Sequence, residues 1–246
     1  MISKPEKRRM SEHISKQFDA ELEAIRSSVL GMAGLVEEQV RLAMQALATG
    51  DMAIIEKVLE QEERVDQMHL NLDDMCIHMI ARRQPAASDL RMVMTVIKSV
   101  EDLERIGDKA SRICQRAKNI YEAGKLQVPR FAELNHIAQQ ALDMLSRALD
   151  AFARLDAVPA TEVKRADQVL DAEYRGLQRQ LITVMMEDPR SISLTLDILW
   201  IAKAIERIGD LAVNVAEQVV YLVKGQDVRH KSVEEMDRVV TTPQGE

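Results

Sequence analysis

The sequence predicts an all-α fold: a tandem repeat of two antiparallel three-helix bundles with six long helices. The first observation is composition. The 246 residues include 3% aromatic residues, 9 Gly and 6 Pro but 14 Met, which is typical of long helices packed through aliphatic side chains. The second is a repeat. The pentamer Glu104–Asp108 recurs letter for letter as Glu206–Asp210, so it begins at residue 104 and again at residue 206, an offset of 102 residues. Such a repeat indicates a duplicated unit.

Six helical segments are predicted between residues that break helices. Apolar residues recur at helical spacing in each segment, and no stretch alternates for long enough to predict a strand. Each pentamer falls on the third helix of its unit. The segments are Ile14–Ala48, Met52–Arg83, a third that fades after Tyr121, Phe131–Leu155, a fifth that reaches Glu187 and a sixth that ends near Gly225.

The boundary between the units is predicted where periodicity breaks, from Gly124 to Pro129. Residues 1–123 then form the first three-helix repeat with a basic N-terminal tail. Residues 130–225 form the second repeat, and residues 226–246 form a polar C-terminal tail. Both tails are expected to be loose. Asp188-Pro189 is predicted to start the sixth helix, because Asp is a frequent N-cap and Pro suits the first helical position.

Charge and cysteine content exclude several classes of protein. The net charge of −7 gives the whole chain no electrostatic footprint for nucleic acid. Cys76 and Cys114 lack a spacing motif, which is typical of reduced cysteines in a cytosolic protein. No apolar stretch follows the basic N-terminal cluster, so no ordinary signal peptide is expected. No uncharged apolar run approaches the roughly 18 residues of a membrane span. A cytoplasmic location is therefore expected.

The pentamer places two acids on one helix face. Residues four apart are neighbours on a helix, so Glu104 lies beside Asp108 and Glu206 beside Asp210, at the edge of an apolar stripe. The intervening Gly lets another helix approach closely. Like charges at this spacing repel unless something positive compensates them. Two interpretations stay open: a solvated edge with arginine partners, or a carboxylate metal site. The candidate arginines are Arg105, Arg112 and Arg207.

The second helix of each unit carries a further acidic stripe. In the first unit this stripe contains Glu62, Asp66, His69 and Asp73, beside an apolar seam. In the second unit the matching stripe begins with Asp167 and Asp171 and continues with Tyr174 and Gln178. Such an oxygen-rich set suits Mg, Mn, Ca or Fe better than structural Zn.

We expect the strongest site in the second bundle. Asp167 and Asp171 should face Glu206 and Asp210 across a helix seam, with Glu217 alongside, and these carboxylates should bind a divalent metal there. Arg207 is expected to point away from the pair, since it lies about 100° round the helix from Glu206.

These residues resemble the PhoU family of phosphate-transport and phosphate-signalling regulators, and the resemblance covers nearly the whole chain. It begins with the pentamer, preceded by Leu or Ile, on the third helix of each repeat. Further segments carry it, namely His13–Phe18, Ala20–Leu22, Arg83–Arg91, Asp150–Arg154 and Met185–Asp188.

The resemblance implies a cytoplasmic homodimer without catalytic activity. It implies a negative regulator of phosphate uptake and of the phosphate-starvation response, acting as an adaptor between the ATPase subunit of the phosphate ABC importer and the PhoR sensor histidine kinase. Contact with the membrane would come only through these partners, and no nucleic acid is implied.

The resemblance also implies Mg, Mn, Fe or Zn ions at paired acids. The pairs are Glu62 with Asp66, Glu104 with Asp108, Asp167 with Asp171, and Glu206 with Asp210. One position departs from the family pattern. Asn214 follows the second pentamer, whereas its counterpart after the first is Arg112, whose guanidinium could neutralise Asp108 in place of a metal.

The alternative function is a carboxylate-rich metal-binding helical protein with a hydrolytic or redox activity. Helical di-iron proteins use inward-facing Glu-x-x-His motifs, and the acidic stripes contain none. The sequence also lacks a Gly-rich phosphate loop and a nucleophile with a placed base. The adaptor interpretation is therefore favoured. A purely structural scaffold is a third interpretation, but packing alone does not require an exactly repeated acidic pentamer.

Overall fold

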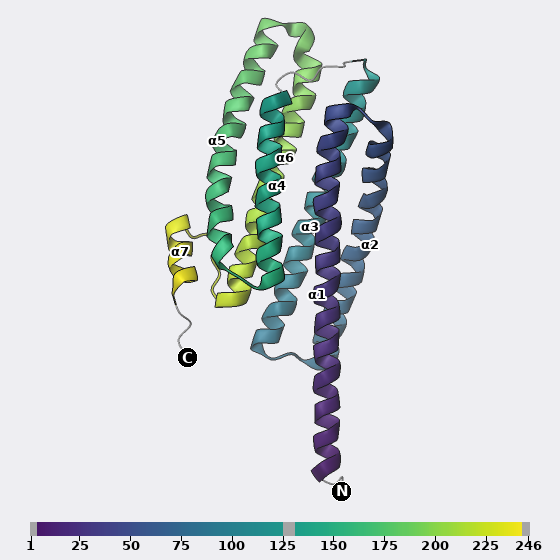
Figure 1. The fold of residues 1–246 in the computed structure, drawn as a ribbon, viewed down its shortest axis with the longest axis vertical. Coiled ribbons are helices and arrows are strands. Elements are labelled where there is room, and N and C mark those ends of the chain that lie inside the picture. Colours follow the sequence, from purple (N-terminus) through teal and green to yellow (C-terminus); the bar gives the residue numbers. More distant parts are fainter. Residues whose placement is uncertain (1–3, 125–130, 243–246) are drawn as a thin grey trace.

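The computed structural model describes residues 4–124 and 131–242, with side chains described from residue 17 onwards. Every regular element within these ranges is helical, so the predicted all-α fold is confirmed (Figure 1). The elements are α1 (Lys4–Thr49), α2 (Met52–Arg83), α3 (Ala87–Glu122), α4 (Phe131–Arg154), α5 (Val158–Glu187), η1 (Pro189–Ser191), α6 (Ile192–Lys224) and α7 (Val233–Thr241). Within the same ranges, no helix is both long enough and apolar enough to cross a membrane.

The helix ends follow local sequence signals. Gly50 turns the chain after α1 with a φ of 67°, and the Asp51 carboxylate accepts a hydrogen bond from the backbone N–H of Ala53 at 2.9 Å to cap α2. Asp188 caps the 3₁₀ turn η1, which leads into α6, as its Asp-Pro sequence predicts. Gly225 ends α6 in the left-handed region. The predicted boundary between the units begins at Gly124, which has a φ of 72°. Residues 125–130 lie outside the described ranges.

The helices form two groups of three that share a central pair. Helices α1, α2 and α3 contact one another, as do α4, α5 and α6, while α3 and α6 lie side by side between the groups (Figure 1). Two polar contacts join this pair. Asn214 Nδ2 donates to Asp102 Oδ1 at 3.2 Å, and Arg116 Nη1 donates to Asp197 Oδ1 at 2.8 Å. Residue numbers rise along α3 as they fall along α6, so the two helices are antiparallel.

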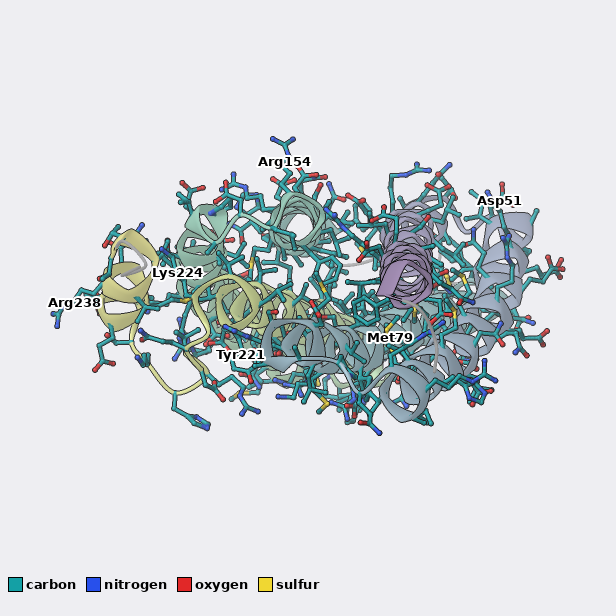
Figure 2. The ribbon with its side chains drawn as sticks, turned by 90° about the horizontal axis from the view of Figure 1, so that it is seen from below. Asp51, Met79, Arg154, Tyr221, Lys224 and Arg238 are labelled. Atoms are coloured by element: carbon teal, nitrogen blue, oxygen red, sulfur yellow. The ribbon has the colours of Figure 1, made fainter. Side chains whose placement is uncertain are left out.

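Both pentamers lie on this central pair, between the two polar contacts. They occupy α3 and α6, the third long helix of each group, as predicted. The apolar stripes beside them are buried in one core that runs through both groups. Seen nearly end-on in Figure 2, the long helices surround this shared interior, and α7 lies at one edge of the molecule.

The glycine of each pentamer sits where a neighbouring helix approaches closely. A Cβ built on Gly107 would lie 3.0 Å from Gln39 Oε1 and 3.5 Å from Val65 Cγ1. A Cβ on Gly209 would lie 2.3 Å from Leu170 Cδ2, closer than real atoms come. Val65 and Leu170 belong to α2 and α5, the helices that carry the acidic stripes. The predicted close approach at these glycines is therefore confirmed.

The two cysteines are reduced and inaccessible. Cys76 on α2 and Cys114 on α3 are both free and buried. Burial disfavours the thiolate and raises the pKa of each thiol to about 12. Both residues therefore act as small apolar side chains of the core.

The prediction of a loose N-terminal tail is wrong from Lys4 onwards, because α1 begins there. The basic segment that precedes Ile14 has Pro only at residue 5, within the first turn, where a missing N–H is tolerated. Its Lys, Glu, Arg and Met residues have high helix propensity, so the first helix extends through it.

The prediction of a loose C-terminal tail is also wrong, because residues 226–246 contain α7, which packs against α5. Val233, Met236 and Val240 are buried on one face of this short helix. A capping box formed by Ser232 and Glu235 fixes its start. The segment is polar on average, but its few apolar residues have helical spacing, and that spacing decides the structure.

Candidate functional site

The four acids of the second bundle come together where α5 packs on α6. We call Asp167, Asp171, Glu206 and Asp210 the second seam. Carboxylate oxygens of Asp171, Glu206 and Asp210 lie within 4.8 Å of one another. Asp167 Oδ1 lies 3.6 Å from the position that a Cβ on Gly209 would occupy, so it borders the same cluster. The acids predicted to face each other across this seam therefore do so.

The second seam concentrates negative charge in a partly buried place. Glu206 is 8% exposed. Burial, together with the neighbouring carboxylates of Asp210 and Asp171, raises the pKa of Glu206 despite the hydrogen bond from Lys203. Burial, then the charges of Asp210, Asp171 and Glu206, raise the pKa of Asp167 to about 6. A proton or a cation at this seam therefore relieves an unfavourable interaction.

Two side chains of α6 already supply part of that compensation. Lys203 Nζ donates to both carboxylate oxygens of Glu206, at 2.5 and 2.6 Å. Arg207 Nη1 donates to Asp210 Oδ2 at 2.8 Å. The expectation that Arg207 points away from the acids is therefore wrong. Arg207 lies about 100° round the helix from Glu206, but residues three apart are neighbours on a helix, so Arg207 reaches Asp210 in the next turn.

Glu217 does not belong to this cluster, although it was expected alongside it. Its carboxylate accepts a hydrogen bond from Lys164 Nζ at 2.7 Å, and the residue is buried. Lys164 lies one turn before Asp167 on α5 and forms its ion pair with Glu217. This ion pair fastens α5 to α6 beside the second seam.

The corresponding acids of the first bundle have different partners. We call Glu62, Asp66, Glu104 and Asp108 the first seam. The Asp108 carboxylate accepts hydrogen bonds from Lys109 Nζ at 2.7 Å and from Arg112 Nε at 2.9 Å. Burial works against the charged form, but these two cations lower the pKa of Asp108. The expected pairing of Arg112 with Asp108 is therefore confirmed.

The two seams differ in whether they can hold a metal ion. Of the side chains that the structure describes, Asp171, Glu206 and Asp210 are the one group of three or more possible ligands within reach of a single ion. Their oxygens suit a hard divalent cation such as Mg²⁺ or Mn²⁺, and neither His nor Cys joins them to favour Zn²⁺. In the first bundle, His69 lies 3.5 Å from Asp73 on the same helix, and Asp108 is paired with Lys109 and Arg112. The described acids of the second seam therefore include three possible ligands within reach of one ion, and those of the first seam include no such group.

Asp102 is a buried acid that sequence reasoning overlooked. It lies two residues before the first pentamer and accepts the hydrogen bond from Asn214 that joins α3 to α6. Burial raises the pKa of Asp102 to about 6, against the opposing effects of Asn214 and Arg105. The sequence contains no signal for this contact, because it depends on the register between two helices that are far apart in the chain. The pairing of Lys203 with Glu206, by contrast, was available from their spacing.

Comparison with known proteins gives a consistent result over most of the chain. The family model described as "PhoU domain" matches twice, over residues 29–117 and 134–219. A phosphate-specific transport system accessory protein PhoU homolog of Pseudomonas aeruginosa is 48% identical over 96% of this chain and 98% of its own length. The phosphate-specific transport system accessory protein PhoU of Escherichia coli strain K12 is 42% identical over 94% of this chain and 95% of its own.

Solved structures agree with these relatives. The crystal structure of PhoU from Pseudomonas aeruginosa superposes with a TM-score of 0.82 at 49% identity, covering 85% of this chain and 100% of that one. A phosphate transport system regulatory protein PhoU from Streptococcus pneumoniae gives a TM-score of 0.78 at 31% identity, covering 86% of this chain and 99% of that one. The two family-model matches each contain one pentamer, as expected for a duplicated unit.

Proposed function

Since this chain belongs to the PhoU family, we propose that it regulates a phosphate-specific transport system as an accessory protein. The observation that carries this proposal is the pair of PhoU domains, together with relatives of nearly equal length that are named as accessory proteins of that system. Regulation would then depend on binding to partners rather than on turnover of a substrate.

In finer detail, we propose a cytoplasmic homodimer that acts as an adaptor. One partner would be the ATPase subunit of the phosphate importer, and the other would be the PhoR sensor histidine kinase. The chain would lower phosphate uptake and the phosphate-starvation response when phosphate is plentiful. The sequence resemblance supports these partners.

The regulatory role is tested in a strain that lacks this chain. We expect a phosphatase reporter of the starvation response to stay active in rich phosphate, and we expect the wild-type gene supplied in trans to restore repression. The measurement is reporter activity at high and low phosphate. Normal repression in the deletion strain would contradict the proposed role.

The adaptor role is tested by isolating the tagged chain from phosphate-replete cells and identifying bound proteins by mass spectrometry. We expect the ATPase subunit and the sensor kinase to be recovered. Cells that lack the importer provide the control, because recovery of the ATPase must then disappear. Isolation of the chain without either partner would argue against an adaptor.

We further propose that the second seam binds a divalent cation such as Mn²⁺ or Mg²⁺. Asp171, Glu206 and Asp210 would hold the ion, with Asp167 beside them. A bound ion would supply the positive charge that four neighbouring carboxylates lack. Lys203 and Arg207 would then lose their present partners and turn to other anions.

The metal proposal is tested by thermal unfolding with chelator and with added Mn²⁺. Binding to the folded chain alone should raise the melting temperature by mass action. The double variant Glu206→Gln with Asp210→Asn should lose this response. The matched variant Glu104→Gln with Asp108→Asn, at the same two positions of the first pentamer, should keep it. An unchanged Mn²⁺ response in the Glu206/Asp210 variant would rule out this site.

A further inference from the structure

A groove with a basic wall lies between α3 and α6, and Lys203 and Arg207 are among the residues that line it. Its volume is about 610 Å³, within the range typical of small-molecule sites. Helix α3 contributes three of its cations and α6 the other two. We call it the α3–α6 groove; its cations and its one aromatic residue are Lys109, Arg112, Arg116, Lys203, Arg207 and Trp200.

The charges of this groove are unevenly placed. The five cations pair with four carboxylates, which belong to Asp108, Asp197, Glu206 and Asp210, so one positive charge is in excess. Of these acids only Asp108 lines the groove, whereas Glu206 and Asp210 face α5 as part of the second seam. The wall of the groove is therefore basic, although the surrounding chain is acidic.

The ion pairs of Arg112 and Arg207 are weak enough for an incoming anion to replace. These two side chains are 63% and 46% exposed, respectively, whereas Lys203 is bound to the buried Glu206 and stays in its pair. Exposed pairs of this kind contribute about 0–1 kcal/mol each, because water screens them. An anion with several phosphoryl groups offers the guanidinium groups paired, charge-assisted hydrogen bonds, which are stronger.

The groove also offers an aromatic surface. Trp200 is 58% exposed, and the Arg116 guanidinium lies 5.8 Å from its ring centroid. Ile113, Ile201 and Ala204 line the groove beside it. An exposed tryptophan next to cations is a surface on which a planar base can stack while its phosphates meet the positive charges.

We propose that the α3–α6 groove binds a nucleoside di- or triphosphate. Arg112, Arg116 and Arg207 hold the phosphoryl groups, and Trp200 stacks against the base. Lys109 and Lys203 add positive charge at the two sides of the groove. The proposed site needs no metal ion, although Lys203 and Arg207 also pair with Glu206 and Asp210 of the second seam, so it is tested in the absence of metal.

Trp200 makes the proposal directly measurable, because the chain contains one tryptophan. The full chain is titrated with ATP in the presence of EDTA, and Trp200 emission is followed, with calorimetry as a second readout. ATP should give a saturable change. Tripolyphosphate, which lacks a base, should bind more weakly by calorimetry, and adenosine, which lacks phosphates, should bind more weakly still. No saturable response to ATP, or equal affinity for tripolyphosphate and ATP, would overturn the proposal.

Two matched variants locate the site. Arg207 and Arg105 hold the same place in the two pentamers and pair with Asp210 and Glu101, respectively, but only Arg207 lines the groove. Arg207→Gln should weaken ATP binding about tenfold, the loss expected for one charge-assisted contact. Arg105→Gln should leave it unchanged. Equal weakening by both variants would mean that ATP responds to net charge rather than to this groove, and would also overturn the proposal. Circular dichroism checks that both variants remain folded.

Discussion

The two pentamers have the same sequence but lie among different side chains. In the first copy, Lys109 and Arg112 both bind Asp108. In the second copy, their places 102 residues later are taken by Leu211 and Asn214, so Asp210 depends on Arg207 instead. Asn214 turns to α3 and binds Asp102. Both copies therefore have cations of their own helix beside the acids, but Asp108 has two such partners, whereas Glu206 and Asp210 have one each and also lie in a carboxylate cluster with Asp171.

This difference shows that residues outside the pentamer determine what its acids can do. A second exchange has the same effect. The residue three positions before the pentamer glutamate is Glu101 in the first copy and Lys203 in the second. Glu101 pairs with Arg105, which removes that arginine from the acids of its pentamer, whereas Lys203 binds Glu206 directly. Duplication preserved the motif, and its neighbours made one copy a candidate metal site.

The largest expected difference concerns the two glycines. Gly209→Ala places a methyl group only 2.3 Å from Leu170 Cδ2, so the buried Leu170 side chain must shift, and overpacking of about 1–3 kcal/mol should exceed the helix-propensity gain of about 1 kcal/mol. Gly107→Ala meets the end of the Gln39 side chain at 3.0 Å, where a small shift suffices. Urea unfolding should show a lower midpoint for Gly209→Ala and an equal or higher midpoint for Gly107→Ala. The reverse order would contradict this account of the two close approaches.

The second prediction concerns two half-buried acids, Glu62 on α2 and Asp167 on α5. The pKa of Asp167 is raised from 3.8 to about 6, so the folded chain holds this proton more tightly than the unfolded chain does. The free energy of unfolding therefore falls as pH rises from about 4 to about 6. Above about pH 6 this loss of stability is fully present. Asp167→Asn should stabilise the chain at neutral pH by about 1 kcal/mol, after allowance for partial solvent access. The gain should vanish below pH 4.

Glu62→Gln is the matched variant in the first bundle. Burial, with the charges of Asp108 and Asp66, raises the pKa of Glu62 too, so its effect has the same sign. The effect should be smaller, because Lys109 and Arg112 offset the charge of Asp108. Denaturant unfolding across this pH range measures both variants. A gain for Asp167→Asn that persists at low pH would show that the charge is not its cause.

The smallest expected effect comes from giving the first seam the neighbours of the second. Lys109→Leu with Arg112→Asn removes two partly exposed ion pairs, so the free energy of unfolding should change by less than about 1 kcal/mol. Asp108 should then be free for a cation, and a second Mn²⁺-dependent rise in melting temperature should appear beside that of the second seam. An unchanged Mn²⁺ response would mean that other features of the second seam are required.

The parts of the fold that depend on local chemistry could be predicted from the sequence. Gly50, Asp51 and Asp188 mark helix ends through backbone freedom and capping, and the exact repeat placed both pentamers on equivalent helices. The two tails were mispredicted because average polarity outweighed helix propensity in the N-terminal segment and the spacing of apolar residues in the C-terminal segment. At the second seam the four acids were correctly predicted to lie close together, because helix geometry fixes which residues share a face.

Contacts that depend on the register between distant helices could not be predicted. Asp102 meets Asn214, and Arg116 meets Asp197, only because α3 and α6 pack antiparallel at one particular offset. The α3–α6 groove follows from the same packing, since its cations come from two segments separated by most of the second repeat. No property of either segment alone reveals it.

The burial of both cysteines has a practical consequence for studying this chain. Cys76 and Cys114 belong to α2 and α3, and their unreactive thiols become accessible to alkylating reagents only when the first group of helices opens. Trp200 lies on α6 against Arg116 of α3, so its emission follows α6 and its contact with the first group. The chain thus carries two natural reporters, and the rate of thiol labelling can be compared with the rate of fluorescence change in one unmodified sample. Different rates would reveal halves that unfold one after the other, and equal rates would reveal a single cooperative unit.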